Sequence, residues 1–216
     1  MMKIKLPNFL IVGAAKSGTS SLHNYLNQHP QVFMPSYNKD GMKVKEPRFL
    51  IKDLVEHRLH NGVWTFDEYQ LLFNKVTDEK AIGESTVLYL YYFKEAIKNI
   101  KYRLDENTRI IIMLRNPVDR AFSAYTHVAR SVKEQLSFEE ALEIEHERLE
   151  LDPTLSPMVM YKDMGLYYNM VKAYLDNFEN VHIIMYEDFK SDTANVVEKT
   201  LEFLAVDSKV SLDTGS

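Results

Sequence analysis

The sequence predicts an α/β fold in which helices flank a central, mostly parallel β-sheet. Short β-rich apolar runs alternate with segments of helical periodicity along the whole chain. The first of these runs leads through a glycine-containing turn directly into a helix start, as in P-loop-like proteins. A length of 216 residues suits one domain with a sizeable core, so we expect a single domain over residues 1–216.

Three apolar runs are predicted to be strands. "NFLIVG" (8–13) is short, apolar and ended by Gly, which is typical of a buried strand. "TRIIIMLRNP" (108–117) contains a β-branched run before a turn at Asn116 and Pro117, and "VHIIMYEDF" (181–189) is the third. "SGTSSLHNYLNQHP" after the first run predicts a helix that stops near Pro30.

Further helices are predicted from apolar periodicity and from their start signals. Thr65 with Glu68, and Ser137 with Glu140, match the capping-box pattern at two of the starts. The segment 151–157 is predicted to be a proline-punctuated loop, and 34–47 an irregular, exposed loop of the kind that often carries function. The expected helices cover residues 65–75, 93–104, 118–131, 137–150, 163–178 and 192–204.

Net charge, the cysteine count and the lack of long apolar stretches exclude or weaken several classes of function. The formal net charge of −5 gives a nucleic-acid role no support, although a local basic pocket can still bind anions. The absence of cysteine excludes disulfides and thiolate metal sites. The N-terminus lacks the apolar region of a signal peptide, and no apolar stretch is long enough to span a bilayer. We therefore expect a cytoplasmic protein with no transmembrane segment.

"GAAKSGTSS" (13–21) predicts an anion site. Free backbone N–H groups converge where a strand turns into a helix, and the helix dipole adds positive potential there. Gly13 and Gly18 allow close approach of the backbone, Thr19 and Ser20 add hydroxyl donors, and Lys16 adds a full charge. The plainer alternative is an ordinary tight turn between strand and helix.

The position of Lys16 argues against an ATP-binding loop. Gly13 and Gly18 have the glycine spacing of the G-x-x-x-x-G-K-[ST] motif, but Thr19 and Ser20 follow Gly18 where the lysine is required. A nucleotide kinase or related phosphotransferase therefore stands only as an alternative.

A second anion site is predicted after the strand within 108–117. Strand ends of a parallel sheet meet at one edge, where ligands bind, so Arg115 and Ser123 together would clamp a second phosphate. Arg120 either joins them or pairs with Asp119 or Glu139 at the surface, and Arg115 alone is equally typical of an arginine that snorkels from a strand end. Two separate phosphate sites suggest a ligand with phosphates at two places.

These segments together resemble the sulfotransferase family that uses 3′-phosphoadenosine 5′-phosphosulfate (PAPS), and especially its heparan sulfate N- and O-sulfotransferases and their bacterial relatives. "GAAKSGTSSLHNYLNQHP" is similar to the 5′-phosphosulfate loop, "KEPRFL" (45–50) to a K-E-x-x-F-F segment, and "LRNPVDRAFSAYTHVAR" to the 3′-phosphate motif. Weaker similarity continues through "MGLYYNMVKAYLDNF" and "VHIIMYEDFKSD", so the likeness spans most of the chain.

The resemblance implies transfer of a sulfuryl group from PAPS to a hydroxyl or amine, with 3′-phosphoadenosine 5′-phosphate (PAP) as product. The acceptor would be a carbohydrate or small molecule, and no metal is required because the donor is already activated. By the same resemblance Lys16 contacts the 5′-phosphosulfate, Glu46 is the general base, and His127 matches a histidine implicated in the N-sulfotransferases. The remaining matches are Ser17, Gly18, Thr19 and Ser20 in the loop, and Arg115 with Ser123 at the 3′-phosphate.

Plainer interpretations stay open for several residues. Glu46 is also typical of a solvated loop charge, and His127 of a histidine on a helix surface. His57 and His60 lack the carboxylates that would support a metal site. Trp64 and "YLYYF" (89–93) would line an acceptor pocket or, more commonly for aromatic residues, pack in the core.

The sequence departs from the family pattern at two places. Glu84 is followed by Ser85 in "GESTVLY", where several heparan enzymes have a lysine, which puts a second basic group and heparan-like specificity in question. Family members also continue past the equivalent of "LEFLAV" into a Lys-Gly-rich loop that closes over the 3′-phosphate, whereas this sequence stops at Ser216. A truncated, non-catalytic nucleotide-binding protein is therefore the second alternative.

Overall fold

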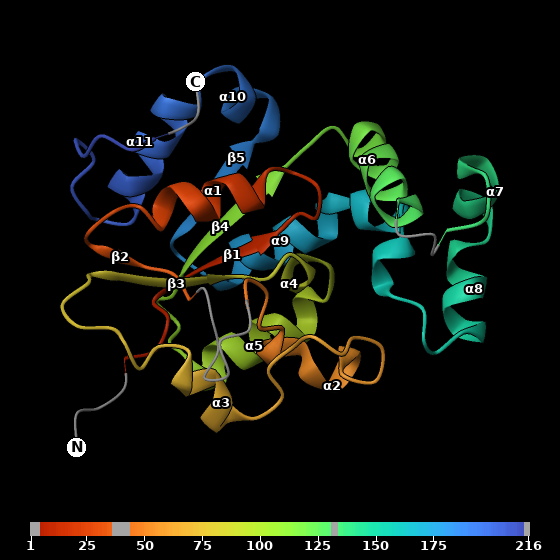
Figure 1. Cartoon of the computed structure of the whole chain (residues 1–216), viewed down its shortest axis with the longest axis horizontal. Coiled ribbons are helices and arrows are strands. Elements are labelled where there is room, and N and C mark those ends of the chain that lie inside the picture. Colours follow the sequence, from red (N-terminus) through yellow and green to blue (C-terminus); the bar gives the residue numbers. More distant parts are fainter. Residues whose placement is uncertain (1–4, 36–43, 131–133, 214–216) are drawn as a thin grey trace.

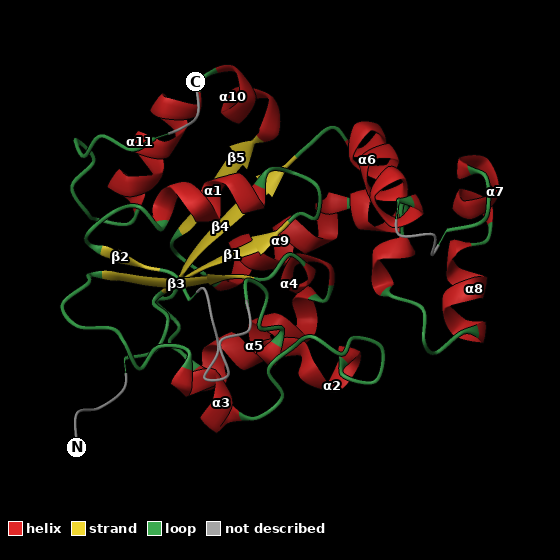
Figure 2. Cartoon of the chain, viewed as in Figure 1, coloured by secondary structure: helices red, strands yellow, loops and turns green. Residues whose placement is uncertain are grey.

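The computed structural model describes residues 5–35, 44–130 and 134–213. Within them, five parallel strands form a sheet of order β2-β3-β1-β4-β5 (Figures 1 and 2). The strands are β1 (Phe9–Gly13), β2 (Val32–Phe33), β3 (Ala81–Ser85), β4 (Arg109–Leu114) and β5 (Val181–Met185). The expected α/β fold with a central parallel sheet is confirmed.

The helices of the described residues cover both faces of the sheet and one end of it (Figure 1). They are α1 (Thr19–Leu26), α2 (Lys52–Val55), α3 (Phe66–Leu71), α4 (Leu88–Tyr91), α5 (Phe93–Arg103), α6 (Pro117–Ala129), α7 (Phe138–Glu143), α8 (Glu145–Leu151), α9 (Tyr167–Asn177), α10 (Tyr186–Ser191) and α11 (Thr193–Phe203). Short 3-10 turns lie at Phe49–Ile51, Pro157–Val159 and Asp163–Gly165.

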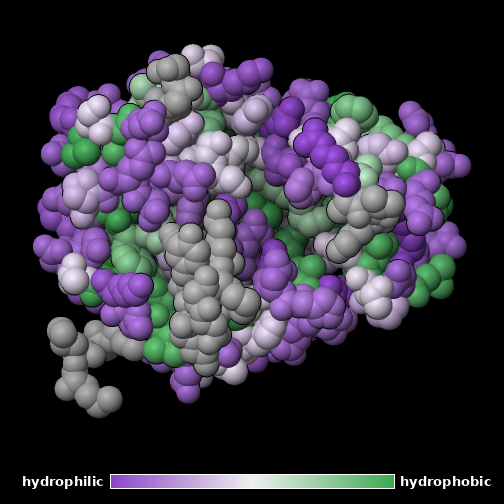
Figure 3. Space-filling view, viewed as in Figure 1, coloured by the Kyte–Doolittle hydropathy of each residue, from purple (hydrophilic) through white to green (hydrophobic). Residues whose placement is uncertain are grey.

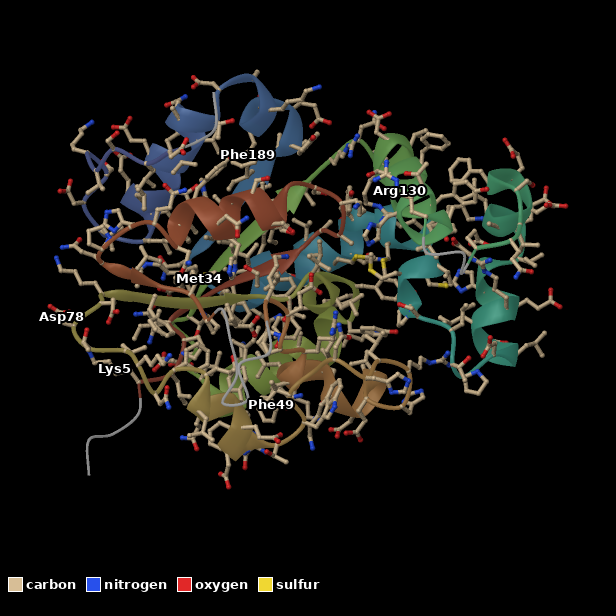
Figure 4. All side chains as sticks on the ribbon, in the orientation of Figure 1. Lys5, Met34, Phe49, Asp78, Arg130 and Phe189 are labelled. Carbon is tan, nitrogen blue, oxygen red and sulfur yellow. The ribbon has the colours of Figure 1, made fainter. Side chains whose placement is uncertain are left out.

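Successive side chains of a strand point to opposite faces of the sheet and pack in two separate cores. Phe9 and Ile11 of β1 pack on one face with α1, α10 and α11, whereas Leu10 and Val12 pack on the other face with α3, α4, α5 and α9. Figure 4 labels one member of each core, Phe189 and Phe49, on opposite sides of the sheet. Because both faces are covered, β1 is fully buried along its length.

Helices α6, α7 and α8 lie beside the end of the sheet and share a smaller core with the turn at Pro157–Val159 (Figure 1). A buried ion pair joins its parts, since both carboxylate oxygens of Glu134 accept from the guanidinium of Arg148, at 2.7 and 2.8 Å. The hydroxyl of Tyr161 also donates to Glu134, at 2.6 Å. The face of the molecule seen in Figure 3 is mainly hydrophilic, with hydrophobic side chains only in small groups.

Most expected elements are present, with shifted ends. The predicted helices 65–75, 93–104, 118–131 and 192–204 correspond to α3, α5, α6 and α11, and that at 163–178 to a 3-10 turn followed by α9. Both capping boxes form, with Thr65 and Ser137 as the N-cap residues. Sequence reasoning did not list β2, β3, α2, α4 or α10.

Three expectations were wrong in detail. The strand expected over 181–189 ends at Met185, because the chain turns into α10 and inserts Phe189 into the core. The helix expected over 137–150 is broken at Ile144, because Glu145 turns inward to accept the backbone N–H groups of Lys162 and Asp163. The loop 34–47 is not exposed where it is described, since Met34 is only 3% exposed; residues 36–43 lie outside the described residues.

Candidate active site

The loop after β1 joins the strand to α1 and places a lysine at the helix start. Lys16 has φ 67° and Gly18, the N-cap of α1, has φ 88°, so both adopt the left-handed region. Gly18 is suited to this region, whereas Lys16 occupies it at a cost of about 1 kcal/mol or more. In the part of the chain that the structure describes, no side chain caps helix α1, so the helix start can offer backbone N–H groups to an anion.

Arg115 follows β4 directly and turns toward the same loop. Its Nη1 donates to the carbonyl oxygen of Lys16 at 3.2 Å, and its guanidinium lies 4.7 Å from the ring centroid of Tyr186. These contacts orient a cation that also lines the cavity described below. Arg115 is therefore a residue of this site rather than a snorkelling arginine.

Helix α6 presents two polar side chains to the cavity. It begins where Asn116 caps it by accepting the N–H groups of Val118 and Asp119, and Pro117 occupies its first turn. Ser123 and His127 are four residues apart and so share one face of the helix. Both line the cavity.

Arg120 takes neither of the places expected for it. It is fully buried on the inner side of α6, where its Nη2 donates to the carbonyl oxygen of Tyr161. It does not line the cavity, and the described ion pairs join it to neither Asp119 nor Glu139. Burial lowers the pKa of this guanidinium.

Glu46 lies in the segment before the 3-10 turn at Phe49–Ile51. Its carboxylate is held between two cations, with Lys45 Nζ 3.3 Å from Oε1 and Arg48 Nη2 3.4 Å from Oε2. The side chain of Glu46 is 21% exposed and lines the cavity. Glu46 is therefore an oriented group of the site and not a freely solvated loop charge.

These segments enclose a cavity of about 380 Å³. Of the residues expected in the site, only Ser17 does not line it, because its side chain is fully buried; its backbone remains part of the loop. The lining consists of Ala15, Lys16, Gly18, Thr19, Ser20, Ser21, Lys45, Glu46, Val87, Arg115, Ser123, His127, Met158 and Tyr186. One cavity thus contains both predicted anion sites and both proposed acid–base residues.

The cavity is electrically positive around its loop side. The pKa of Lys16 is lowered by burial and by the neighbouring charges of Arg130 and Arg115. The pKa of His127 is lowered from 6.5, chiefly by the charge of Lys16, so that near pH 7 its imidazole is mostly neutral. Figure 4 labels Arg130, the residue that follows α6. A bound anion would offset the mutual repulsion of these cations.

Sequence reasoning missed several lining residues. Lys45 precedes Glu46 in "KEPRFL" and supplies a second lysine, although Ser85 stands where some relatives have one. Tyr186 follows β5 at the same sheet edge as Arg115, and that position was the available signal for it. Val87 and Met158 carried no comparable signal, because they are apolar residues placed by the packing of distant segments.

The aromatic residues considered for an acceptor pocket divide among three places. Tyr89 is fully buried in the core, and Trp64 packs against that core while partly exposed. Tyr91, Tyr92 and Phe93 line a separate cavity of about 630 Å³, where the hydroxyl of Tyr91 donates to Asp163 at 2.7 Å. None of these residues lines the cavity that contains Lys16.

The described residues offer neither a metal site nor a membrane span. Among them, no group of three or more histidine, aspartate or glutamate side chains is arranged to bind a metal ion, and His57 and His60 form no such group. No helix in these ranges is both long and apolar enough to cross a bilayer.

The cavity brings cationic and acid–base side chains together. Lys16 and the loop before α1 line the same cavity as Arg115 and Ser123, and Glu46 and His127 line it too. Such a site orients two reactants and stabilises a leaving anion.

Comparisons of the sequence and of the structure with known proteins both identify sulfotransferases. The family model described as "Sulfotransferase domain" matches residues 6–214. The crystal structure of a sulfotransferase from Alicyclobacillus acidocaldarius is 39% identical with a TM-score of 0.84, covering 97% of this chain and 85% of that one. Mouse sulfotransferase SULT7A1 complexed with PAP shares only the fold, at 18% identity and a TM-score of 0.55, covering 94% of this chain and 61% of that one.

Curated relatives are much longer than this chain. Human bifunctional heparan sulfate N-deacetylase/N-sulfotransferase 2 is 31% identical over 57% of this chain, but only 13% of its own length is matched. The chain spans less than half the length of each of the first relatives found.

Proposed function

Because the chain belongs to the sulfotransferase family, whose model matches residues 6–214, we propose that it transfers a sulfuryl group from PAPS to a hydroxyl or amine. The observation that carries the proposal is the single cavity that brings Lys16 and Arg115 together with Glu46 and His127. The relatives' activities belong to longer proteins, so the proposal rests on this chain's own site.

The donor fits the two anion sites. Lys16, the backbone of Ser17 and Gly18, and the hydroxyls of Thr19 and Ser20 would hold the 5′-phosphosulfate at the start of α1. Arg115 and Ser123 would hold the 3′-phosphate. Among the described residues, the buried Nε atom of Arg115 has no hydrogen-bond partner, so it is available to a ligand in the cavity.

The proposed reaction needs a base on one side of sulfur and a cation on the other. Glu46 accepts the proton of the acceptor hydroxyl or amine as the acceptor atom forms its bond to sulfur, and neutral His127 assists from α6. The bond between sulfur and the bridging oxygen of the 5′-phosphate breaks, and its electron pair stays on that oxygen. Lys16 stabilises the phosphate that departs as PAP. The chemistry requires no metal, because PAPS is an activated donor.

The acceptor is proposed to be a carbohydrate or a small molecule. The name of the human relative refers to heparan sulfate, which supports a carbohydrate only by analogy. The chain lacks a lysine after Glu84, so heparan itself is not implied. The expected cytoplasmic location also stays a prediction, which cell fractionation would test.

Calorimetry with PAP and 5′-AMP tests the donor site. PAP is expected to bind at least about tenfold more tightly, because only PAP engages Arg115 and Ser123. Arg115→Met should weaken PAP binding more than 5′-AMP binding and so reduce this preference, because Arg115 also contacts the loop at Lys16. Equal affinity of the wild-type protein for the two nucleotides would refute the 3′-phosphate clamp.

A sulfate-transfer assay with a panel of acceptors tests turnover. Lys16→Ala is expected to lower kcat by about 100-fold or more, since it removes the cation at the leaving phosphate. Lys190→Ala, an exposed lysine on α10, serves as the control and should leave kcat unchanged. Transfer that survives Lys16→Ala would contradict the assigned role.

The assay also separates the alternatives. A nucleotide kinase would require Mg²⁺-ATP and a lysine after Gly18, where this chain has Thr19. A non-catalytic nucleotide-binding protein would bind PAP with the same preference but transfer nothing to any acceptor. Glu46→Gln, with PAP affinity retained and transfer lost, would distinguish the proposed enzyme from both.

A further inference from the structure

Glu84 is a buried carboxyl group that the proposed reaction does not use. It lies in β3, is 0% exposed, and none of the ion pairs found in the described ranges includes it. Burying a carboxyl group without a cation is costly unless hydrogen bonds compensate. An apolar residue would fill this place in a buried strand at lower cost, so the carboxyl group needs another explanation.

Three hydroxyl groups donate to Glu84. Tyr89 donates to Oε1 at 2.7 Å, Tyr69 to Oε1 at 3.3 Å, and Thr86 to Oε2 at 2.9 Å. We call these four residues the Glu84 network. A hydroxyl that directs its hydrogen at Glu84 has oxygen lone pairs that face away from the carboxyl group and can accept from other donors.

Two of these hydroxyls accept from one backbone segment. The N–H of Arg48 donates to Oγ1 of Thr86, and the N–H of Leu50 donates to the hydroxyl of Tyr89, both at 3.3 Å. Glu84 thus orients two acceptors for the same turn. The turn needs such support, because Arg48 has φ 60°, in the left-handed region that costs a residue with a Cβ about 1 kcal/mol or more.

The same segment carries Glu46. Arg48 Nη2 lies 3.4 Å from the Glu46 carboxylate. Arg48 Nη1 donates to Oδ1 of Asn61 at 2.9 Å and also to the backbone carbonyl oxygen of Asn61. The backbone position of Arg48 therefore determines the position of its guanidinium, and the guanidinium in turn orients the Glu46 carboxylate.

We propose that Glu84 is a positioning residue for the active site: through Thr86 and Tyr89 it fixes the turn at Arg48 to Leu50, and through Arg48 it orients Glu46. This inference rests on the proposed role of Glu46 as the base. Tyr69 belongs to the network but supports no backbone group of that turn in the hydrogen bonds described.

Amide hydrogen exchange tests the first step without requiring turnover. Glu84→Leu removes the acceptor of three buried hydroxyls and risks unfolding, so Thr86→Val is the variant of choice. It should speed exchange of the Arg48 amide by about tenfold, the value of one ordinary hydrogen bond. Tyr69→Phe removes one equally buried hydroxyl from Glu84 and should change this rate less than about twofold, as should Thr86→Ser, which keeps the hydroxyl. An Arg48 amide that is unaffected by Thr86→Val would overturn the proposal.

Steady-state kinetics test the second step. Thr86→Val should lower kcat about tenfold while the Kd for PAP stays unchanged, since Lys16, Arg115 and Ser123 lie on other segments, and Thr86→Ser should restore kcat. If Glu46→Gln abolishes transfer but Thr86→Val leaves kcat unchanged, this inference fails and the proposed function stands. If Glu46→Gln leaves transfer intact, the role of Glu46 as base fails, and the positioning proposal fails with it.

Discussion

Replacing Glu84 with glutamine is expected to change how stability depends on pH. Burial raises the pKa of the Glu84 carboxyl group from 4.5 to about 7, against the opposing effect of the hydrogen bonds from Tyr89, Thr86 and Tyr69. The folded protein therefore keeps a proton on Glu84 at pH values where the unfolded chain has released it. The stabilising contribution is fully present below about pH 4.5 and is lost as the pH rises through 7.

The magnitude follows from the difference between the two pKa values. At about 1.4 kcal/mol for each pKa unit, a rise from 4.5 to about 7 corresponds to about 3–4 kcal/mol. Most of this falls between pH 5 and pH 8. Glu84→Gln places a neutral amide in the same volume and cannot titrate, so its free energy of unfolding should lack this decline.

Urea unfolding at pH 5 and pH 8 provides the measurement. The wild-type protein should lose about 2–3 kcal/mol more than Glu84→Gln between the two pH values. Comparing the change with pH, and not the absolute stability, removes any fixed cost of the substitution. Glu150→Gln, an exposed residue of α8, is the control and should follow the wild type. Parallel wild-type and Glu84→Gln profiles would show that Glu84 is already ionised in the folded protein and refute the argument.

Three further outcomes are expected. Gly18→Ala should lower the free energy of unfolding by about 1–2 kcal/mol and weaken PAP binding, because φ is 88° and the new Cβ would lie 3.2 Å from the Tyr186 ring. Urea unfolding and calorimetry measure the two effects, and unchanged stability and affinity would contradict a requirement for glycine at this position. Glu134→Gln should cost about 3 kcal/mol in urea unfolding, because it leaves the largely buried Arg148 without its carboxylate, and a change within experimental error would contradict a buried ion pair. Lys16→Met should raise the pKa of His127 toward 6.5 in an NMR titration, because Lys16 is the main cause of its lowering, and an unmoved titration would place the two groups too far apart to interact.

The parts of the fold that sequence predicted are those determined by local patterns. β1 and β4 are continuous apolar runs, and the capping boxes at Thr65 and Ser137 mark the starts of α3 and α7. β3 was missed because "AIGES" contains Gly and Glu inside a fully buried strand. Gly83 is required there because a Cβ would lie 2.2 Å from the ring of Phe9 in the neighbouring strand, a contact that no local pattern reveals.

The residues of the site likewise divide into those that sequence patterns predict and those that they do not. Lys16 and Arg115 could be predicted because Lys16 lies in the loop after β1 and Arg115 follows β4, and the order of elements in a parallel sheet brings both to one edge. Glu46 could be assigned only through family resemblance, because its place depends on Arg48 and Asn61 and not on a strand end. Arg120 was misplaced since the sequence of α6 shows its periodicity but not that Tyr161 covers its inner side.

Glu84 shows why the buried residues that support a site cannot be predicted from sequence motifs. In the sequence it stood out for the residue after it, Ser85, where a lysine was expected; in the fold, Ser85 faces the opposite side of the sheet and lies 3.0 Å from Nδ1 of His23. The carboxyl group itself meets hydroxyls from α3, α4 and the residue after β3, and two of them support a turn that lies more than thirty residues earlier in the chain. A substitution at Glu84 would therefore change the base at Glu46 without altering any residue that touches a substrate, which is why hydrogen exchange at Arg48 is the measurement that distinguishes this arrangement from simple core packing.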